Sequence, residues 1–295
     1  MSLYTTHSTS TVKAMTSIFE YEFMVRALIG GAMVGALAPV LGMFLVLRRF
    51  ALIADTLSHV AFMGVAIGLI TKISPPLVAL GTTSIAAVAI DQLRARRMMP
   101  GDAALAVFLY AALAIAVVVI SLAGGFNVDL LSYLFGNVLT IDTTDLWLVA
   151  GLMVVVIGFV GMFFSELSQS SFDGDLARTS GVPVGCVNLI LSVLTGATIT
   201  LSMRIVGVLL VGALIVIPVI ASLRLATGLR TAVLLAMTIG VFSALLGLTI
   251  AFYANVAAGG AVVLTAVGLL VLVEVAAALR DRLRRATAPS TGSST

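Results

Sequence analysis

Long apolar runs separated by short polar connections make up most of this chain. A helix that crosses a bilayer needs about 20 mostly apolar residues. Nine segments meet this requirement, near 24–47, 52–71, 76–93, 103–124, 145–164, 183–202, 205–225, 231–253 and 260–279. The stretch 183–225 also fits one span followed by a short re-entrant helix. The pattern therefore predicts an all-α polytopic membrane protein with eight or nine transmembrane helices.

The composition supports the same class. Hydrophobic residues make up 61% of the 295 residues, charged residues make up 10%, and the mean hydropathy is +1.21. A soluble domain cannot bury that much apolar surface, whereas a polytopic membrane protein exposes it to lipid. The formal charge of +3 is too small to indicate nucleic-acid binding. A single cysteine, Cys186, excludes a disulfide framework and a multi-cysteine metal site within one chain.

Basic residues are distributed unevenly around the predicted spans, which indicates an orientation. With the N-terminus outside, the outer side receives four basic residues, Lys13, Arg26, Lys72 and Arg204. The inner side receives twelve, Arg48, Arg49, Arg94, Arg96, Arg97, Arg178, Arg224, Arg230, Arg280, Arg282, Arg284 and Arg285. Because cytoplasmic loops hold the excess of Lys and Arg, we expect a cytoplasmic C-terminus. The Ser- and Thr-rich tails 1–20 and 286–295 are expected to be flexible, with 21–285 forming one transmembrane domain.

The predicted outer connection GGFNVDLLSYLFGNVLTIDTTDL is too apolar for a bare loop. It contains no Lys or Arg, and a re-entrant or surface-lying helix fits its semi-apolar middle. Its three aspartates are Asp129, Asp142 and Asp145. Their field would favour cations, or a basic face on a docking protein. A plain solvated loop is the alternative reading of the same aspartates.

Two inner connections are suited to short cytoplasmic helices. SELSQSSFDGDLARTSGVP is amphipathic and contains Asp173 and Asp175. In IPVIASLRLATGLRT, Pro218 is expected to break or bend the helix, and Arg224 and Arg230 mark the cytoplasmic surface. Such helices either dock a partner protein or simply lie at the interface.

The stretch LIADTLSHVAFMG places Asp55 and His59 four positions apart, on one face of a predicted span. Ionisable residues within a span are costly unless paired, so they indicate function. Carboxylate and imidazole suit Zn²⁺ or Mn²⁺ better than Cu(I), which prefers sulfur. Two ligands cannot fill a coordination shell, but a two-fold dimer would supply four. The structural alternatives are a local Asp–His hydrogen bond and an Asp55 helix cap.

Several catalytic signatures are missing from the sequence. There is no G-x-x-x-x-G-K-[ST], and the only lysines are Lys13 and Lys72, so this chain cannot bind ATP through a P-loop. H-E-x-x-H and G-x-S-x-G are missing as well. The commonest signatures of ATP-binding and hydrolytic enzymes are therefore missing, and we expect that this chain is not an enzyme.

Four stretches, in the same order, closely resemble the zinc/manganese ABC-importer permeases, the ZnuB- and MntB-like family. They are MFLVLRRFALIADTLSHVAFMGVAIG, VDLLSYLFGNVL, MRIVGVLLVGALIVIPVIASLRLA and FYANVAAGGAVVL. The resemblance spans about residues 24 to 280. It implies an ABC-importer permease fold in the plasma membrane of a prokaryote. It also implies a homodimer, a separate cytoplasmic ATPase and an extracytoplasmic metal-binding protein, with Mn²⁺ or Zn²⁺ as transported substrate and no permanently bound cofactor.

The resemblance also assigns roles to residues. It implies that Asp55 and His59 contact the ion as it passes. The family's Asn in the FGN stretch is Asn137; zinc-type relatives often have Asp there, which favours manganese slightly. Arg204 is a charged residue at the edge of an apolar run. Like Asn137, it is a candidate residue of the metal pathway or of the outer loop. Span 103–124 lacks the histidine that some zinc-type members have there.

The segment from Pro218 to Thr231 resembles the ATPase-coupling segment of related importers, and residues 172–181 are expected to lie beside it. The candidate coupling residues are Pro218, Arg224, Arg230, Asp173 and Asp175. The ATPase and the binding protein themselves are not identified by the sequence.

Three other functions fit parts of the pattern. A proton- or sodium-coupled secondary metal transporter would use the Asp–His pair as a relay, but we detect no repeated halves of the kind expected for it. A siderophore- or cobalamin-type ABC permease must pass a large ligand and has no use for D-x-x-x-H. A membrane-embedded enzyme would need a second catalytic carboxylate or a nucleophile, for which candidates are sparse.

Overall fold

The computed structural model describes residues 20–96, 101–125 and 128–287, and within these ranges it contains helices and no strand. The helices are α2 (Glu22–Leu47), α3 (Leu52–Thr71), α4 (Pro75–Ala95), α5 (Gly101–Leu122), α6 (Val128–Phe135), η1 (Val138–Thr140), α7 (Thr143–Met162), α8 (Phe164–Phe172), α9 (Gly174–Thr179), α10 (Val184–Val206), α11 (Val208–Leu225), α12 (Leu229–Ala254) and α13 (Ala258–Thr287). The predicted all-α class is confirmed. The predicted tails lie outside the described ranges, apart from Glu20 and the end of α13.

Eight of the described helices are long and apolar enough to cross a bilayer, namely α2, α3, α4, α5, α7, α10, α12 and α13. α11 is also apolar but shorter, with its apolar part at Leu210–Leu225. Gly207 separates α10 from α11 and has a φ of 92°, a left-handed conformation that residues with a Cβ rarely adopt. The stretch 183–225 therefore forms two helices, a long α10 and a shorter α11, separated at Gly207.

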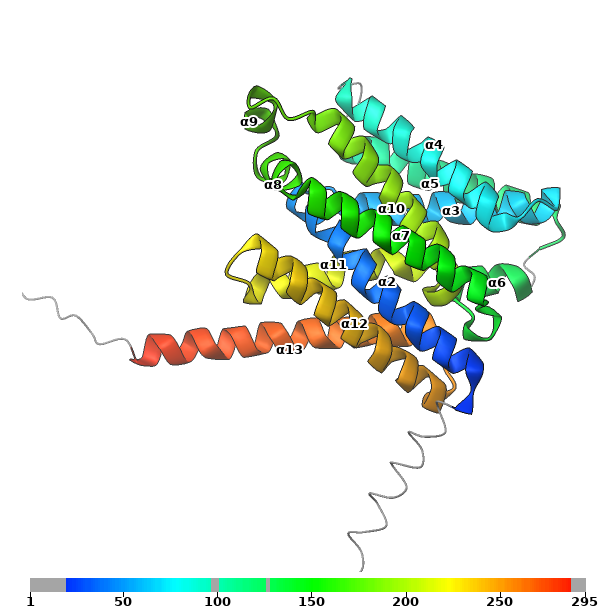
Figure 1. The fold of residues 1–295 in the computed structure, drawn as a ribbon. Helices are drawn as coiled ribbons and strands as arrows, with labels where there is room; N and C mark the ends of the chain where they lie inside the picture. The colour runs from blue at the N-terminus through cyan, green and yellow to red at the C-terminus, as the bar shows by residue number, and fades with distance from the viewer. Residues whose placement is uncertain (1–19, 97–100, 126–127, 288–295) are drawn as a thin grey trace, which may run out of the picture.

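The helix ends group at two ends of the bundle (Figure 1). The beginning of α2 and the end of α12 lie at one end, whereas the end of α2 and the beginning of α12 lie at the other, toward which the end of α13 also points. Arginines gather at this second end: Arg94 of α4 lies 3.6 Å above the ring of Phe50 in the α2–α3 turn. Arg224 and Arg230 flank the α11–α12 turn there. The distribution of basic residues along the sequence predicts that these arginines lie at one end of the bundle, as they do here.

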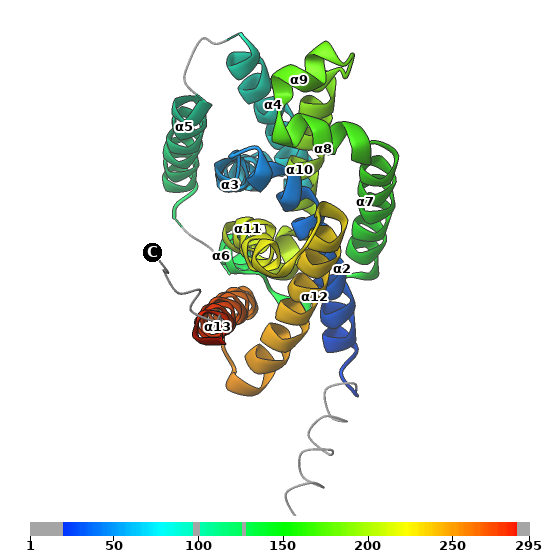
Figure 2. The same cartoon turned by 90° about the vertical axis from the view of Figure 1, so that its left-hand side faces the viewer.

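α2 lies in the centre of the bundle and α13 at its edge (Figure 2). In the most apolar window of α2, 72% of the residues are buried, against 11% for α13. α2 and α12 approach closely at two glycines. A Cβ on Gly35 would lie 2.6 Å from the carbonyl oxygen of Gly240, and one on Gly240 would lie 2.1 Å from that of Gly35. Small residues allow such backbone contact between helices in lipid.

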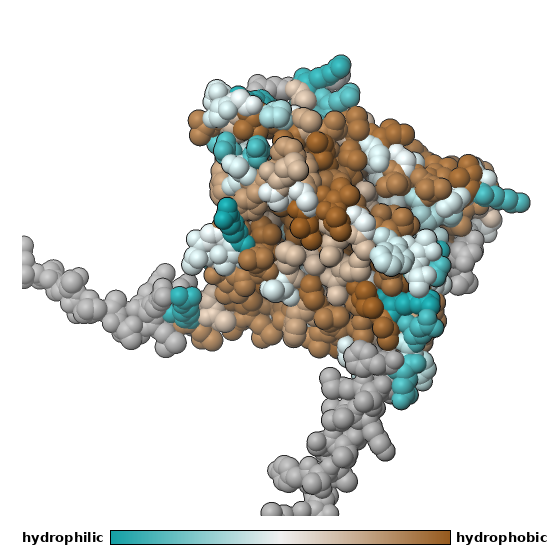
Figure 3. All heavy atoms as spheres, viewed as in Figure 1, coloured by the Kyte–Doolittle hydropathy of each residue, from teal (hydrophilic) through white to brown (hydrophobic). Residues whose placement is uncertain are grey.

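The surface agrees with a membrane location. Hydrophobic residues cover most of the visible face, and hydrophilic groups gather toward the ends of the helices (Figure 3). Large apolar side chains such as Val154 on α7 and Leu264 on α13 are more than 70% exposed. In a bilayer, lipid covers this surface.

Three of the four quoted sequence stretches meet at one point, which we call the glycine junction: Gly136, Gly207 and Gly259. A Cβ on Gly136 would lie 2.8 Å from the backbone of Val206. One on Gly207 would lie 2.5 Å from the backbone oxygen of Leu134, and one on Gly259 would lie 2.1 Å from that of Val206. The junction thus holds the α6–η1 turn and the beginning of α13 against the break between α10 and α11.

Candidate metal pathway

Asp55 and His59 lie one turn apart on α3, as predicted. His59 Nε2 is 3.8 Å from Asp55 Oδ1. The Asp55 side chain is 52% exposed and the His59 side chain is 17% exposed. Nδ1 of His59 is buried and has no hydrogen-bond partner among the described residues. The two side chains therefore share a helix face and retain free donor atoms, as a pair of metal ligands requires.

Both structural alternatives for this pair fail. The separation of 3.8 Å is an ion-pair distance and is too long for a hydrogen bond. The N-cap of α3 is Ala51, which makes no side-chain cap hydrogen bond, and Asp55 already lies within the first turn. Asp55 is therefore not a helix cap, and the pair is not a closed Asp–His hydrogen bond.

The backbone of α11 lies beside Asp55. A Cβ added to Gly212 would be 3.7 Å from the backbone of Ala54 and from the backbone nitrogen of Asp55, an ordinary van der Waals contact. Within the residues that the structure describes, no three His, Cys, Asp or Glu side chains are grouped so that they could hold a metal ion. A metal ion bound at Asp55 and His59 would therefore find two such ligands in the described part of one chain, and we call this pair the half-site.

The α8–α9 corner presents both charged and apolar groups to solvent. Oδ1 of Asp173 caps α9 by accepting hydrogen bonds from the N–H groups of Asp175 and Leu176, both at 3.0 Å. Asp175 lies 3.8 Å from Arg178, and both side chains are strongly exposed. Phe172 is 70% exposed and Leu176 is 65% exposed. Asp173 therefore has a local structural role, while apolar side chains beside it stay exposed.

The segment 218–231 connects α11 to α12 at the same end of the bundle. Pro218 lies within α11, which continues to Leu225. Of the two expectations, a break is therefore wrong, and a bend stays a prediction. Nε of Arg224 donates to both carboxyl oxygens of Glu274 on α13, at 3.0 and 3.1 Å. The Arg230 guanidinium lies 5.6 Å above the ring of Phe164. Because Phe164 begins α8, this contact brings the segment beside the start of α8, at the opposite end of that helix from Phe172.

Asn137 is a structural cap. Its Oδ1 accepts a hydrogen bond from the N–H of Leu139 at 3.0 Å, and its Nδ2 donates to Ser132 Oγ at 3.3 Å. Its own N–H donates to the carbonyl oxygen of Arg204 at 3.3 Å. These contacts fix η1 to the end of α10, next to the glycine junction.

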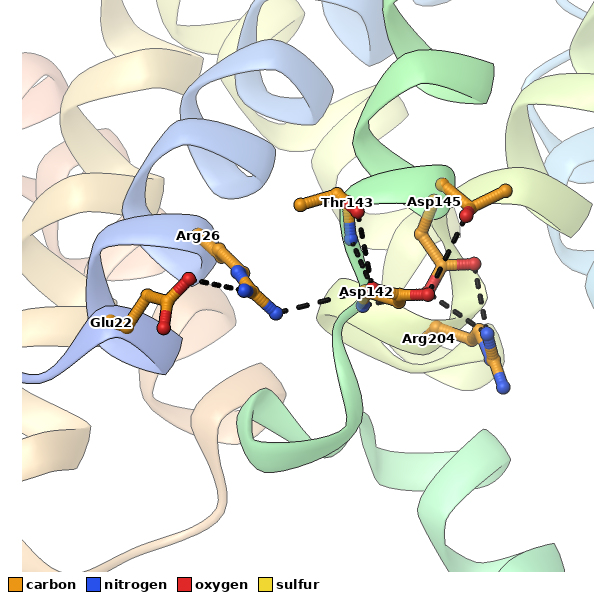
Figure 4. Close-up of polar contacts among 7 residues, drawn as sticks. Glu22, Arg26, Asp142, Thr143, Asp145 and Arg204 are labelled. Atoms are coloured by element: carbon orange, nitrogen blue, oxygen red, sulfur yellow. Dashed lines mark hydrogen bonds and ion pairs between the residues drawn. The ribbon is translucent and has the colours of Figure 1, made fainter.

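Arg204 links three helices at the other end of the bundle (Figure 4). Its NH1 group donates to both carboxyl oxygens of Asp145 on α7, each at 2.9 Å. Its guanidinium lies 5.9 Å from the ring centre of Tyr133 on α6. The Asp145 side chain is only 12% exposed, and charge-assisted hydrogen bonds of this kind are about twice as strong as neutral ones. Arg204 also lines a cavity of about 280 Å³ with Leu69, Pro75, Ser132, Tyr133 and Thr140.

Asp142 caps the beginning of α7. Its Oδ1 accepts from the N–H of Thr143 at 2.7 Å, while its own N–H donates to Asp145 Oδ2 at 3.1 Å. Arg26, which is hydrogen-bonded to Glu22, lies 4.0 Å from Asp142 (Figure 4). Two of the three outer aspartates are therefore engaged in a cap and in ion pairs, rather than free to attract cations.

The same contacts lower the pKa of Asp142, chiefly through the hydrogen bond from the Thr143 backbone. A carboxyl whose pKa falls on folding stabilises the fold above its ordinary pKa of about 4. This contribution is lost as the pH falls through the lowered pKa. The cap is therefore fully formed at neutral pH.

From the sequence, Arg48 was predicted only as one of the basic residues on the inner side. It follows the last residue of α2, and its side chain donates hydrogen bonds to Ser170, Ser171 and Asn188. No local pattern signals this, because the partners lie more than 120 positions away along the chain.

Comparisons with known proteins identify the family of this chain. The ABC 3 transport family model matches residues 20–277. The manganese import system permease protein ScaB of Streptococcus gordonii is 31% identical over 84% of this chain and 89% of its own length. The high-affinity zinc uptake system membrane protein ZnuB of Haemophilus influenzae is 32% identical over 85% of this chain and 97% of its own length.

A solved structure shares the fold. The structure of PsaBC from Streptococcus pneumoniae in complex with Fab aligns with a TM-score of 0.80 at 29% identity, covering 89% of this chain and 95% of that chain. The predicted permease fold is thereby confirmed. With matches that extend over nearly the whole bundle, this chain belongs to the ABC 3 transport family.

Proposed function

We propose that this chain is the membrane-spanning permease subunit of an ATP-driven importer of manganese or zinc ions. The observation that carries the proposal is the Asp55–His59 pair: two metal-ligand side chains on one face of a spanning helix, with Nδ1 of His59 unpartnered. Ionisable groups at such positions mark ion pathways. The relatives named above for manganese import and zinc uptake support the choice of cargo.

The half-site implies a dimer. Asp55 and His59 supply two ligands, and the described part of the chain adds no third residue of the same kind to the group. A second copy related by a two-fold axis would bring the total to four, enough for tetrahedral Zn²⁺. Manganese accepts the same carboxylate and imidazole donors with added water. We favour manganese slightly, because α5 contains no histidine and the FGN stretch has Asn137 instead of Asp.

The energy source is a separate chain. The sequence has no P-loop, so an ATPase subunit must supply hydrolysis from the cytoplasm. The α8–α9 corner and the segment 218–231 form the surface for it, because both lie at the arginine-rich end that the positive-inside rule places in the cytoplasm. The opposite end, with Arg204 and Asp145, would receive metal from an extracytoplasmic binding protein. The protein then resides in the plasma membrane with its N-terminus outside.

Transport follows an alternating-access cycle. ATP binding closes the two ATPases, and their movement, transmitted through the cytoplasmic helices, changes which side of the membrane the dimer opens to. Asp55 and His59 provide an intermediate stop for the cation. Release is possible because imidazole binds metal only when deprotonated and correctly placed.

ATP dependence separates this proposal from its rivals. In proteoliposomes containing the permease and its ATPase, we expect uptake of Mn²⁺ or Zn²⁺ only with ATP and binding protein present. Collapse of proton and sodium gradients should leave uptake unchanged. Uptake by the permease alone, driven by a proton or sodium gradient, would instead show a secondary transporter.

A further inference from the structure

Arg48 connects the end of α2 to two other helices. Its Nε donates to Ser171 Oγ at 3.0 Å and its NH2 group donates to Ser170 Oγ at 2.6 Å, both on α8. Its NH1 group donates to Asn188 Oδ1 on α10. All three nitrogens of the guanidinium group therefore donate a hydrogen bond, each to a different acceptor.

The turn that follows Arg48 is fixed on its other side as well. Phe50 is 5% exposed, and Arg94 of α4 lies above its ring. Arg49 between them is exposed and adopts a left-handed φ of 55°. The α2–α3 turn is thus held by α8 and α10 through Arg48 and by α4 through Phe50.

This turn leads directly into the half-site. α3 begins at Leu52, and Asp55 is in its first turn. The short turn leaves no flexible linker between the Arg48 anchor and Asp55. A movement of α8 that shifts Arg48 must therefore shift the beginning of α3.

We propose that Arg48 is a positioning residue that fastens the α2–α3 turn to α8, so that displacement of α8 by the ATPase moves Asp55 and His59. This inference rests on the proposed function. In this proposal, movement of the cytoplasmic helices reaches the half-site through Arg48 and the α2–α3 turn. The contacts of Asp55 and His59 themselves do not show this connection.

The contacts require arginine rather than lysine. Lysine has a single ammonium group and cannot reach acceptors on three sides in the fixed geometry of a guanidinium. The charges facing Arg48 are those of Asp91 and Arg94 on α4. Burial lowers the pKa of Arg48 to about 10, which leaves it charged at neutral pH. Lysine at this position keeps the charge and loses the geometry.

The experiment measures uptake and ATP hydrolysis together. Wild type, Arg48→Gln and Arg48→Lys are reconstituted with the ATPase and binding protein, and Arg49→Gln is the control that removes the neighbouring exposed charge. We expect both Arg48 variants to hydrolyse ATP at a rate near wild type. Metal taken up per ATP should fall by about tenfold, within the usual range of coupling between two sites. Arg49→Gln should match wild type.

Ser171→Ala and Asn188→Ala, made separately, remove single acceptors and guard against misfolding of the Arg48 variants. Each should lower uptake per ATP by a smaller factor. Unchanged uptake per ATP in Arg48→Gln, or parallel loss of uptake and hydrolysis in all of these variants, would overturn the coupling role. Failure of the wild type to take up Mn²⁺ or Zn²⁺ with ATP would instead refute the proposed function.

Discussion

Replacing His59 with alanine should abolish metal uptake and leave the permease in the membrane at its wild-type level. Loss of even an outer-shell partner of a metal ligand costs about 10- to 100-fold, so we expect removal of the ligand itself to reduce uptake by about 100-fold or more. Insertion should survive, because His59 has no hydrogen bond to lose at its buried nitrogen and alanine is a better helix former. Radioactive manganese or zinc uptake, with immunoblotting of the membrane fraction, measures both.

His7→Ala is the matched control, because His7 is the only other histidine in the chain. It should transport as wild type does. Asp55→Asn should reduce uptake as well, since it removes the charge but keeps the size of the side chain. Normal uptake by His59→Ala would contradict the assignment of the half-site.

Gly259→Ala should prevent stable folding. The added methyl group would lie 2.1 Å from the carbonyl oxygen of Val206 and 2.9 Å from that of Phe135. Neither oxygen can move without shifting the glycine junction, because both belong to backbone. Overpacking of a core typically costs about 1–3 kcal/mol, and this backbone clash belongs at the upper end of that range or above it.

Gly260→Ala tests the same substitution one position further along α13. Nothing lies within 4 Å of a Cβ at Gly260, so we expect an unchanged or slightly raised midpoint of thermal unfolding, since alanine favours helix by about 1 kcal/mol over glycine. Size-exclusion profiles of the detergent-extracted variants, before and after heating, report the difference. Equal stability of the two variants would show that the junction tolerates a Cβ.

The membrane fold was predictable because hydrophobic runs of spanning length need no tertiary information. All nine predicted segments correspond to helices, and 205–225 became the short α11. The predicted semi-apolar outer helix is α6. The break at Gly207 was less predictable, because it lies where the end of α6 and the beginning of α13 approach the backbone of Val206 and Gly207. That approach joins stretches about 70 and 50 residues away, as the positions of Gly136 and Gly259 show.

The candidate site was predictable only in part. The i, i+4 spacing placed Asp55 and His59 on one face, and α3 has them there. The distribution of basic residues also predicted which end of the bundle holds segment 218–231, where that segment contacts α8. The sequence did not show that Asn137 and Asp173 serve as local caps, or that Glu274 pairs with Arg224. Such contacts depend on how the helices pack against one another. The periodicity of hydrophobic residues along the sequence does not predict that packing.

Arg48 illustrates the same limit. In sequence it is one of two adjacent arginines in a turn, with nothing to distinguish it from Arg49. In the fold, Arg48 makes three hydrogen bonds to distant residues while Arg49 is exposed. Only the packing of α8 against the end of α2 separates their roles.

The metal content of whole cells tests the central claim most directly. A strain deleted for this chain, without a redundant importer, is grown under metal limitation and complemented with wild type or His59→Ala, and its elements are measured by mass spectrometry. We predict that wild type alone restores cellular manganese or zinc, and the restored element names the cargo. Unchanged manganese, zinc and iron in the deletion strain would contradict metal import by this permease.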